Sequence, residues 1–223
     1  MDTLAPALQL PTPRLRRSRP PSRTRIRCSS MPTTFHTLRN LMLTLAMVSG
    51  LATAASVAVA QNNTTPSFTL KDTNNKNYTV TVKDGKLKTG PGDQLEDKNA
   101  VLISFWATWC GPCKLEMPHV NELHKKYNEK GFEGISVSID DSRAYSQARA
   151  YVKGRKDADK KPYQFVALFD KESKVVAMFN PSKTLPYTVI IDSAGKIRNI
   201  HTGYNPGDEK KLEEEIKAIL EEG

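Results

Sequence analysis

Alternation of apolar and polar residues marks the first elements of the chain. Residues 67–82, SFTLKDTNNKNYTVTV, alternate on either side of an asparagine-rich centre, and this pattern predicts a β-hairpin. Residues 83–99 contain several glycines and Pro91, so we expect a loop there. The run VLISFW at 101–106 is almost entirely apolar, which is typical of a strand buried on both faces of its sheet.

A helical period follows. Met117, Val120, Leu123 and Tyr127 recur at helical spacing, which predicts a helix that ends near Gly131. The same criteria predict strands at 134–140, at 164–170 and on both sides of a turn at 193–195. They predict helices at 142–156, 171–179 and 207–222, and Asp208 is expected to cap the last helix. Strands that alternate with helices, followed by a terminal hairpin and helix, indicate an α/β fold with a central mixed β-sheet flanked by helices.

The net charge belongs to the start of the chain. The 223 residues carry a formal charge of +9, but residues 1–60 hold eight of the 33 basic residues and one of the 24 acidic residues. Residues 61–223 therefore keep 25 basic and 23 acidic residues. A nearly balanced domain does not favour a polyanionic ligand, so we exclude nucleic acid as a partner.

Residues 31–60 have the pattern of a secretory signal peptide. A short head with Arg39 precedes an apolar run from Leu41, and the small residues Ala58-Val59-Ala60 form a cleavage site. Polar and small residues interrupt the apolar run, which disfavours a permanent membrane anchor or a buried helix. We therefore expect a periplasmic or otherwise exported protein, cleaved near Ala60, with membrane contact only through an uncleaved signal segment.

The predicted signal peptide separates residues 1–30 from residues 61–223. Residues 1–30 are arginine-rich like a transit peptide, but five prolines oppose the amphipathic helix that such a peptide needs. We interpret them as an upstream extension from a mis-assigned start. Residues 61–66 are polar and predict a flexible linker, which leaves residues 67–223 as one domain.

Two cysteines remain after the leader is set aside. Cys28 lies within it, and Cys110 and Cys113 stand three positions apart in FWATWCGPCKLEMP, residues 105–118. A disulfide that closes so short a loop constrains the unfolded chain little, which disfavours a structural role. Two thiolates can hold a soft metal, but zinc needs about four ligands and no second CxxC follows. The pair therefore favours redox chemistry.

The expected helix supplies a reason for that chemistry. If Cys110 opens the helix, Cys113 lies one turn further on nearly the same face, close enough to form a disulfide. Free N–H groups and the positive end of the helix dipole favour a thiolate at Cys110. Because the thiolate is the attacking species in thiol–disulfide exchange, we predict that Cys110 is the nucleophile and Cys113 the resolving thiol.

FWATWCGPC resembles the active-site segment of the thioredoxin superfamily, and the continuation KLEMP resembles its exported TlpA/ResA/DsbE-like branch. The resemblance extends over residues 66–223 and includes LPYTVIIDSAGKI at 185–197. It implies a thioredoxin-like fold with an N-terminal β-hairpin and a mid-chain strand–helix insertion. It also implies that Trp109 shields the cysteine pair and that the dipeptide Gly111-Pro112 sets the redox potential. Leu185 and Pro186 correspond to a substrate-binding loop in which the proline is cis.

The chain departs from thioredoxin at one place. Thioredoxin itself has a buried aspartate six residues before the first cysteine, and Ser104 stands there in this sequence. No carboxylate at that place can take the proton of Cys113. Glu116 occupies the acidic position that the branch has after the cysteines and is a candidate substitute. The alternative is that Glu116 is a solvated helix residue.

The predicted function is that of an exported thiol–disulfide oxidoreductase of the protein-disulfide reductase type, in cytochrome c maturation or a related partner-specific role. Its expected partners are protein thiols and disulfides and an upstream dithiol electron donor, and we expect a monomer without a cofactor. A general thiol oxidase or isomerase is the first alternative. A copper chaperone is the second, but the histidine that copper-delivering relatives carry before the proline loop is absent from NPSKTLPYT at 180–188.

Overall fold

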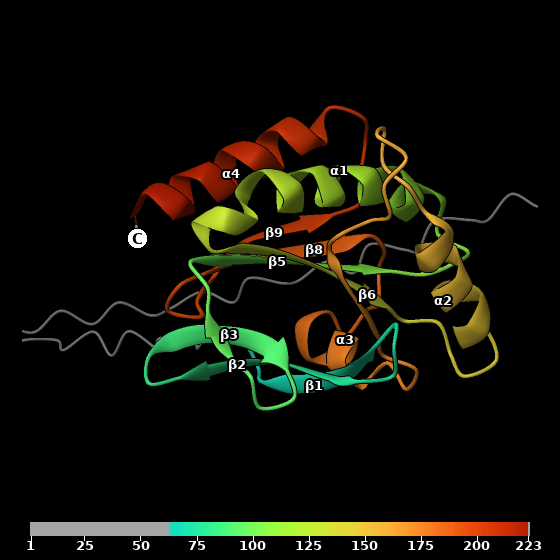
Figure 1. Ribbon diagram of the computed structural model, residues 1–223, viewed down its shortest axis with the longest axis horizontal. Helices are drawn as coiled ribbons and strands as arrows, with labels where there is room; N and C mark the ends of the chain where they lie inside the picture. Colours follow the sequence, from blue (N-terminus) through green and yellow to red (C-terminus); the bar gives the residue numbers. More distant parts are fainter. Residues whose placement is uncertain (1–62, 223) are drawn as a thin grey trace, which may run out of the picture. The chain divides into compact units, whose positions relative to one another are not determined.

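The computed structural model describes residues 63–222 (Figure 1). The predicted signal peptide and upstream extension lie outside the described residues. One nine-stranded mixed sheet organises the domain, in the order β4-β3-β2-β1-β7-β6-β5-β8-β9. Its strands are β1 (Phe68–Asp72), β2 (Asn77–Lys83), β3 (Lys86–Pro91), β4 (Glu96–Asp97), β5 (Ala100–Trp106), β6 (Phe132–Ser138), β7 (Val166–Phe169), β8 (Tyr187–Asp192) and β9 (Ile197–Thr202).

The direction of the strands changes on either side of the centre. β5, β6 and β7 run parallel, whereas β8 pairs antiparallel with β5 and β1 pairs antiparallel with β7. Every residue of β5 and β6 is buried, as both strands are covered on both faces. This mixed sheet confirms the predicted fold class.

Helices cover both faces of this sheet. They are α1 (Gly111–Tyr127), α2 (Tyr145–Gly154), α3 (Lys174–Phe179) and α4 (Asp208–Glu222), with a 3₁₀ turn, η1 (Asn128–Lys130), after α1. Val120 of α1, Ala148 of α2 and Leu212 of α4 share one apolar core. The short α3 packs Val175 and Val176 into a second core, together with apolar residues of β1, β2 and β3. None of the described helices is long and apolar enough to cross a bilayer.

The predicted loop at 83–99 is wrong, because β3 and β4 lie within it. Asp84 and Gly85 have φ of 55° and 70°, the positive values that a two-residue hairpin turn of type I′ requires. β3 therefore continues the first hairpin, and its Leu87 is fully buried against the sheet. The Asp-Gly pair was a hairpin signal that the abundance of glycines obscured.

Two smaller expectations also fail. A flexible linker was expected at 61–66, but the described residues of this segment are paired with the chain around Gly195. The N–H of Thr65 donates to the Gly195 carbonyl at 2.8 Å, and Thr64 forms a β-bridge with Lys196. Asp208 does not cap α4 as expected. It is the first residue of that helix, and its carboxylate accepts the N–H of Asn205 at 2.8 Å, which closes the preceding turn.

Candidate active site

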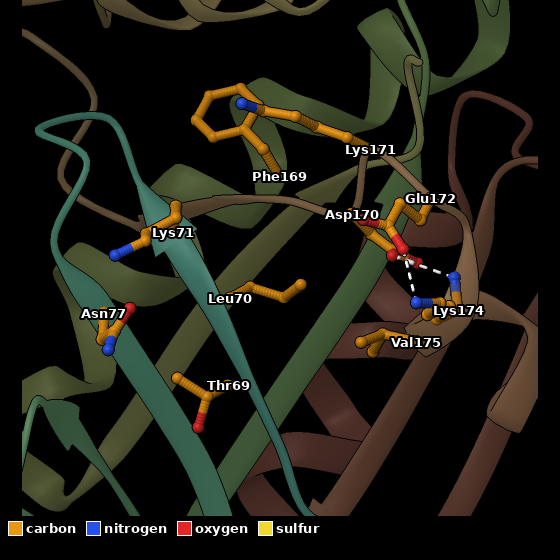
Figure 2. A pocket seen from close by; sticks show the side chains of 10 residues that line it. All are labelled: Thr69, Leu70, Lys71, Asn77, Phe169, Asp170, Lys171, Glu172, Lys174 and Val175. Atoms are coloured by element: carbon orange, nitrogen blue, oxygen red, sulfur yellow. Dashed lines mark hydrogen bonds and ion pairs between the residues drawn. The ribbon is translucent and has the colours of Figure 1, made fainter. Parts of the chain in front are cut away.

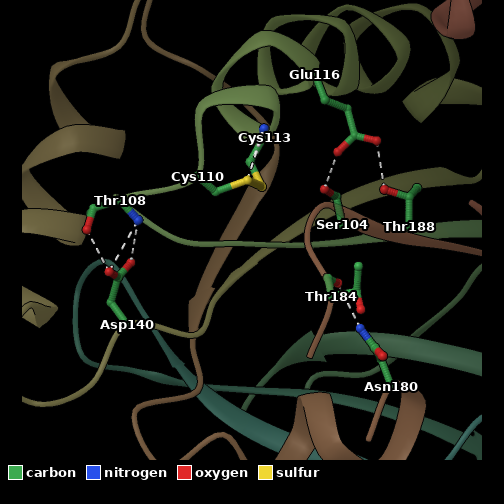
Figure 3. The surroundings of a disulfide bond; sticks show 9 residues. All are labelled: Ser104, Thr108, Cys110, Cys113, Glu116, Asp140, Asn180, Thr184 and Thr188. Carbon is green, nitrogen blue, oxygen red and sulfur yellow. Dashed lines mark hydrogen bonds between the residues drawn. A yellow bond between two sulfur atoms is a disulfide. The ribbon is translucent and has the colours of Figure 1, made fainter. Parts of the chain in front are cut away.

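β5 leads directly to the cysteine pair. It ends at Trp106, and Cys110 is the N-cap of α1, where its sulfur accepts the N–H of Cys113 at 3.2 Å. The two sulfurs form a disulfide with a Cα–Cα distance of 5.4 Å (Figure 3). Cys110 thus lies at the positive end of the α1 dipole and already receives one of its free N–H groups.

Both cysteines are almost fully buried. The exposed fraction is 4% for Cys110 and 1% for Cys113. Trp109 is instead 71% exposed, and Gly111 and Pro112 are exposed beside it. The surface around the disulfide is therefore presented by the neighbours of Cys110, and Trp109 offers a large apolar contact area there.

The proline loop lies at the same edge of the sheet. Tyr187 of β8 is in register with Phe105 of β5, so the start of β8 lies beside the end of β5, from which Cys110 follows. The Leu185–Pro186 bond is cis, which confirms the expectation from the resemblance. Within residues 63–222, no hydrogen bond occupies the backbone N–H or C=O of Leu185. These groups are available to an extended polypeptide.

Asn180 holds the loop that leads to this bond. Its side-chain amide donates to the Thr184 carbonyl at 2.8 Å (Figure 3), and the hydroxyl of Ser182 donates to its Oδ1 at 2.6 Å. Asn180 is buried, so it acts as an internal brace. The sequence analysis did not identify this residue.

Glu116 is buried behind the disulfide, with an exposed fraction of 1%. Its Oε2 accepts the Ser104 hydroxyl at 2.6 Å, and its Oε1 accepts the Thr188 hydroxyl at 2.7 Å (Figure 3). Burial raises the pKa of Glu116 above its ordinary value, and the two hydrogen bonds oppose this rise in part. The alternative of a solvated side chain is therefore wrong.

Asp140 is a second buried carboxylate that the sequence analysis missed. It accepts the backbone N–H of Thr108 at 2.9 Å, the Thr108 hydroxyl at 2.6 Å and the Ser138 hydroxyl at 2.9 Å (Figure 3). Thr108 lies two residues before Cys110, so Asp140 fixes the segment between β5 and α1. The available signal was an aspartate directly after an apolar, alternating strand.

A surface pocket of about 370 Å³ lies elsewhere, between β1, β7 and the start of α3 (Figure 2). Lys71, Asp170 and Lys174 are among its lining residues, and neither cysteine is. The Asp170 carboxylate accepts the N–H groups of Lys174 and Val176 at 3.0 and 2.8 Å, so it serves the start of α3. Within 63–222, no group of three or more His, Cys, Asp or Glu side chains is placed to hold a metal ion.

A disulfide at the start of α1, a cis-proline loop at the same sheet edge and a mixed sheet between helices define a thioredoxin-like protein. The chain belongs to the Redoxin family, whose model matches residues 60–216, and within it to the ResA- and DsbE-like thiol–disulfide oxidoreductases.

Individual relatives agree with this assignment. The chain is 30% identical over 164 residues to the thiol–disulfide oxidoreductase ResA of Geobacillus thermodenitrificans, a match that covers 74% of this chain and 78% of that protein. It is also similar to a solved structure described as a DsbE-type thiol:disulfide interchange protein from Chlorobium tepidum, with 27% identity, a TM-score of 0.53 and coverage of 70% of this chain and 95% of that one. A thioredoxin-like protein from Porphyromonas gingivalis has 28% identity, a TM-score of 0.51 and coverage of 71% and 92%.

Proposed function

We propose that this thiol–disulfide oxidoreductase is an exported protein-disulfide reductase with Cys110 and Cys113 as its catalytic residues. The observation that carries the proposal is the Cys110 sulfur at the N-cap of α1, which accepts the Cys113 N–H. A donor at this place stabilises negative charge on sulfur and so favours the attacking thiolate.

The proposed reaction moves two electrons in two exchanges. In the reduced protein, the Cys110 thiolate attacks a disulfide of the partner, forms a mixed disulfide and releases one partner thiolate. Cys113 then loses its proton and attacks the Cys110 sulfur, which releases the second partner thiolate. The protein is left as the Cys110–Cys113 disulfide, and an upstream dithiol reduces it again.

Glu116 is the proposed acceptor of the Cys113 proton. It lies three residues beyond Cys113, and residues at this spacing share one side of a helix (Figure 3). Burial raises the pKa of Glu116 and so makes its carboxylate a better base than a solvated one. This arrangement replaces the aspartate that thioredoxin has at the place of Ser104, because Ser104 here donates its hydroxyl to Glu116.

Partner binding is proposed for the exposed surface beside the disulfide. The exposed Trp109 would contact the partner. The free backbone groups of Leu185, together with the adjoining Pro186, would hold an extended segment of the partner. Gly111 and Pro112 are proposed to tune the redox potential. Export is proposed from the signal-peptide pattern at 31–60, and partner-specific reduction, in cytochrome c maturation or a related process, from the likeness to ResA.

Two measurements test the function. Equilibration with glutathione gives the reduction potential, which should lie near the roughly −270 mV of reducing thioredoxins; a value near the roughly −120 mV of DsbA would make the protein an oxidase. The reduced protein should also reduce insulin disulfides, and Cys110→Ser should abolish this activity. Sequencing of the native N-terminus should find a chain that starts near Gln61, and a soluble form that keeps Met1 or Met31 would contradict export.

A further inference from the structure

A small cavity reaches Glu116 from a side that the active-site residues do not line. Its volume is about 100 Å³, which is enough for several water molecules. Its lining includes Glu116, His201, Tyr204, Asp208 and Lys211. Neither cysteine lines it, and neither residue of the cis peptide bond does. Asp208 and Lys211 are exposed, so the cavity joins a buried carboxylate to the surface at the start of α4.

Polar side chains continue from Glu116 along this route. Thr188, which donates to Glu116, is directly opposite His201 in the antiparallel pair of β8 and β9. Directly opposed residues project from the same face of a sheet, here the face that α1 and α4 cover. The Nε2 of His201 is 2.6 Å from a carboxylate oxygen of Glu215 on α4, and the two side chains are 18% and 16% exposed.

The charged and titratable groups around Glu116 come from several elements. His119 lies on α1 itself and stacks on Tyr204 with 5.9 Å between ring centroids. Tyr204 donates to Glu209, while Asp208, Lys211 and Glu215 come from α4. His201 and His119 both lower the pKa of Glu116 by their positive charge. Among these groups, His201 is the imidazole that lines the cavity, and an imidazole can both accept and donate a proton.

The reaction creates a need for such a route. In the mixed disulfide the partner covers the surface around Trp109, where Cys110 is already buried. The proton that Cys113 gives to Glu116 needs a path to solvent if the carboxylate is to be restored while the partner covers this surface. We propose that the cavity between α1, β9 and α4 is the proton exit of Glu116, and that His201, held by Glu215, is the positioning residue that passes the proton from cavity water to the surface. This inference rests on the proposed role of Glu116.

The proton and electron balance is complete without a further reactant. Cys113 loses one proton to the Glu116 carboxylate as its thiolate forms the S–S bond with Cys110. The electron pair leaves on the released partner thiolate. Glu116 returns the proton to cavity water, His201 accepts it there and releases it to solvent, and Glu116 is again a carboxylate.

The test follows the second exchange alone. The mixed disulfide with a peptide carrying a chromophoric thiol is formed between pH 5 and 9 in dilute buffer. The released thiol times its resolution, and a pH-indicator dye times the release of the proton to solvent. In His201→Ala, proton release near pH 7 should slow about tenfold, less than the roughly 10²–10⁴-fold that a directly acting acid–base group contributes. Added imidazole should restore the rate of proton release, and the attack by Cys110 should be unchanged. Glu215→Gln should slow proton release in the same direction without deleting the imidazole.

The control is His124→Ala, which also removes a part-buried histidine, here one of α1 itself. The Nδ1 of His124 accepts the N–H of Gly134, and His124 does not line the cavity. Proton release in this variant should match the unmodified protein. If His201→Ala releases the proton at the normal rate, or if imidazole fails to restore the rate, the exit route is wrong. Glu116→Gln distinguishes the two proposals. Slow resolution in Glu116→Gln with normal proton release in His201→Ala refutes the route alone, whereas normal resolution in Glu116→Gln refutes the role of Glu116 itself.

Discussion

The hydroxyl of Ser104 on β5 donates a 2.6 Å hydrogen bond to the carboxylate of Glu116 on α1. Thr188 on β8 donates to the other oxygen of the same carboxylate. A hydroxyl can donate or accept, so either partner can turn to accept a proton from a neutral Glu116. The site therefore provides hydrogen bonds for both charge states of Glu116, as a residue that repeatedly gains and loses a proton requires.

Loss of the Ser104 hydroxyl should move the pH dependence of the reaction. The Ser104 bond lowers the pKa of Glu116, so in Ser104→Ala that pKa rises further and the carboxylate is protonated at a higher pH. The acidic limb of the kcat/KM profile should shift to higher pH. Ser136→Ala is the matched control, because Ser136 is buried at the register position opposite Ser104 and makes no hydrogen bond to Glu116. An identical shift in both variants would contradict the assignment.

Replacement of Glu116 should lower the activity of the protein and raise its stability. Because burial raises the folded-state pKa of Glu116, the folded protein binds this proton more tightly than the unfolded chain, and stability falls as pH rises through the shifted range. Glu116→Gln removes the buried charge while it can still bond Ser104 and Thr188. Its Tm should exceed that of the unmodified protein at pH 8, by about 2–4 °C for each kcal/mol gained. The difference should shrink toward pH 4, and an equal difference at both pH values would be evidence against a buried carboxylate.

The two cysteines should differ in reactivity. With Cys113→Ser, the remaining Cys110 lies at the helix N-cap and should be alkylated near pH 7 about 3–10-fold faster than Cys113 in the Cys110→Ser protein. Rates against pH give the thiol pKa of each variant. Cys113→Ser should also accumulate mixed disulfides with partners, and Cys110→Ser should not. Faster reaction of Cys113 would reverse the proposed roles.

Asp140 should matter for both stability and rate. Asp140→Ala removes the acceptor of the Thr108 backbone and hydroxyl groups, and a buried N–H left without a partner costs about 1–3 kcal/mol. Denaturant unfolding should show this loss, and kcat/KM should fall because the segment before Cys110 is no longer fixed. Asp141→Ala is the control, since that exposed neighbour pairs with Arg143 and accepts the N–H groups of Arg143 and Ala144 at the surface. Water can replace these bonds there, so Asp141→Ala should cost less stability than Asp140→Ala.

The features that the sequence predicts well are those that depend on residues close together in the chain. The cysteine pair and its place at a helix start follow from a short motif with local geometry, whereas the cis bond before Pro186 was expected only from the family resemblance. The burial of Glu116 does not, because its partner Thr188 is 72 positions away and is brought close by strand pairing and helix packing. Ser104 and Thr188 were nevertheless visible as lone hydroxyls within apolar runs, and a polar residue inside a buried strand predicts a partner.

The short segment before β1 would set how far the domain could move from a membrane if the proposed signal segment were retained. The carbonyl of Asn63 accepts the N–H of Ile197 at 2.7 Å, so the chain is already bonded to β9 at this point. Only Gln61 and Asn62 separate it from the predicted cleavage site, and two residues span at most about 7 Å. If the signal segment were retained, this short segment would tether the domain to the membrane and restrict which partners can approach. Cleavage would release a freely diffusing carrier of electrons, so the choice between them decides whether the enzyme meets membrane-bound or dissolved partners.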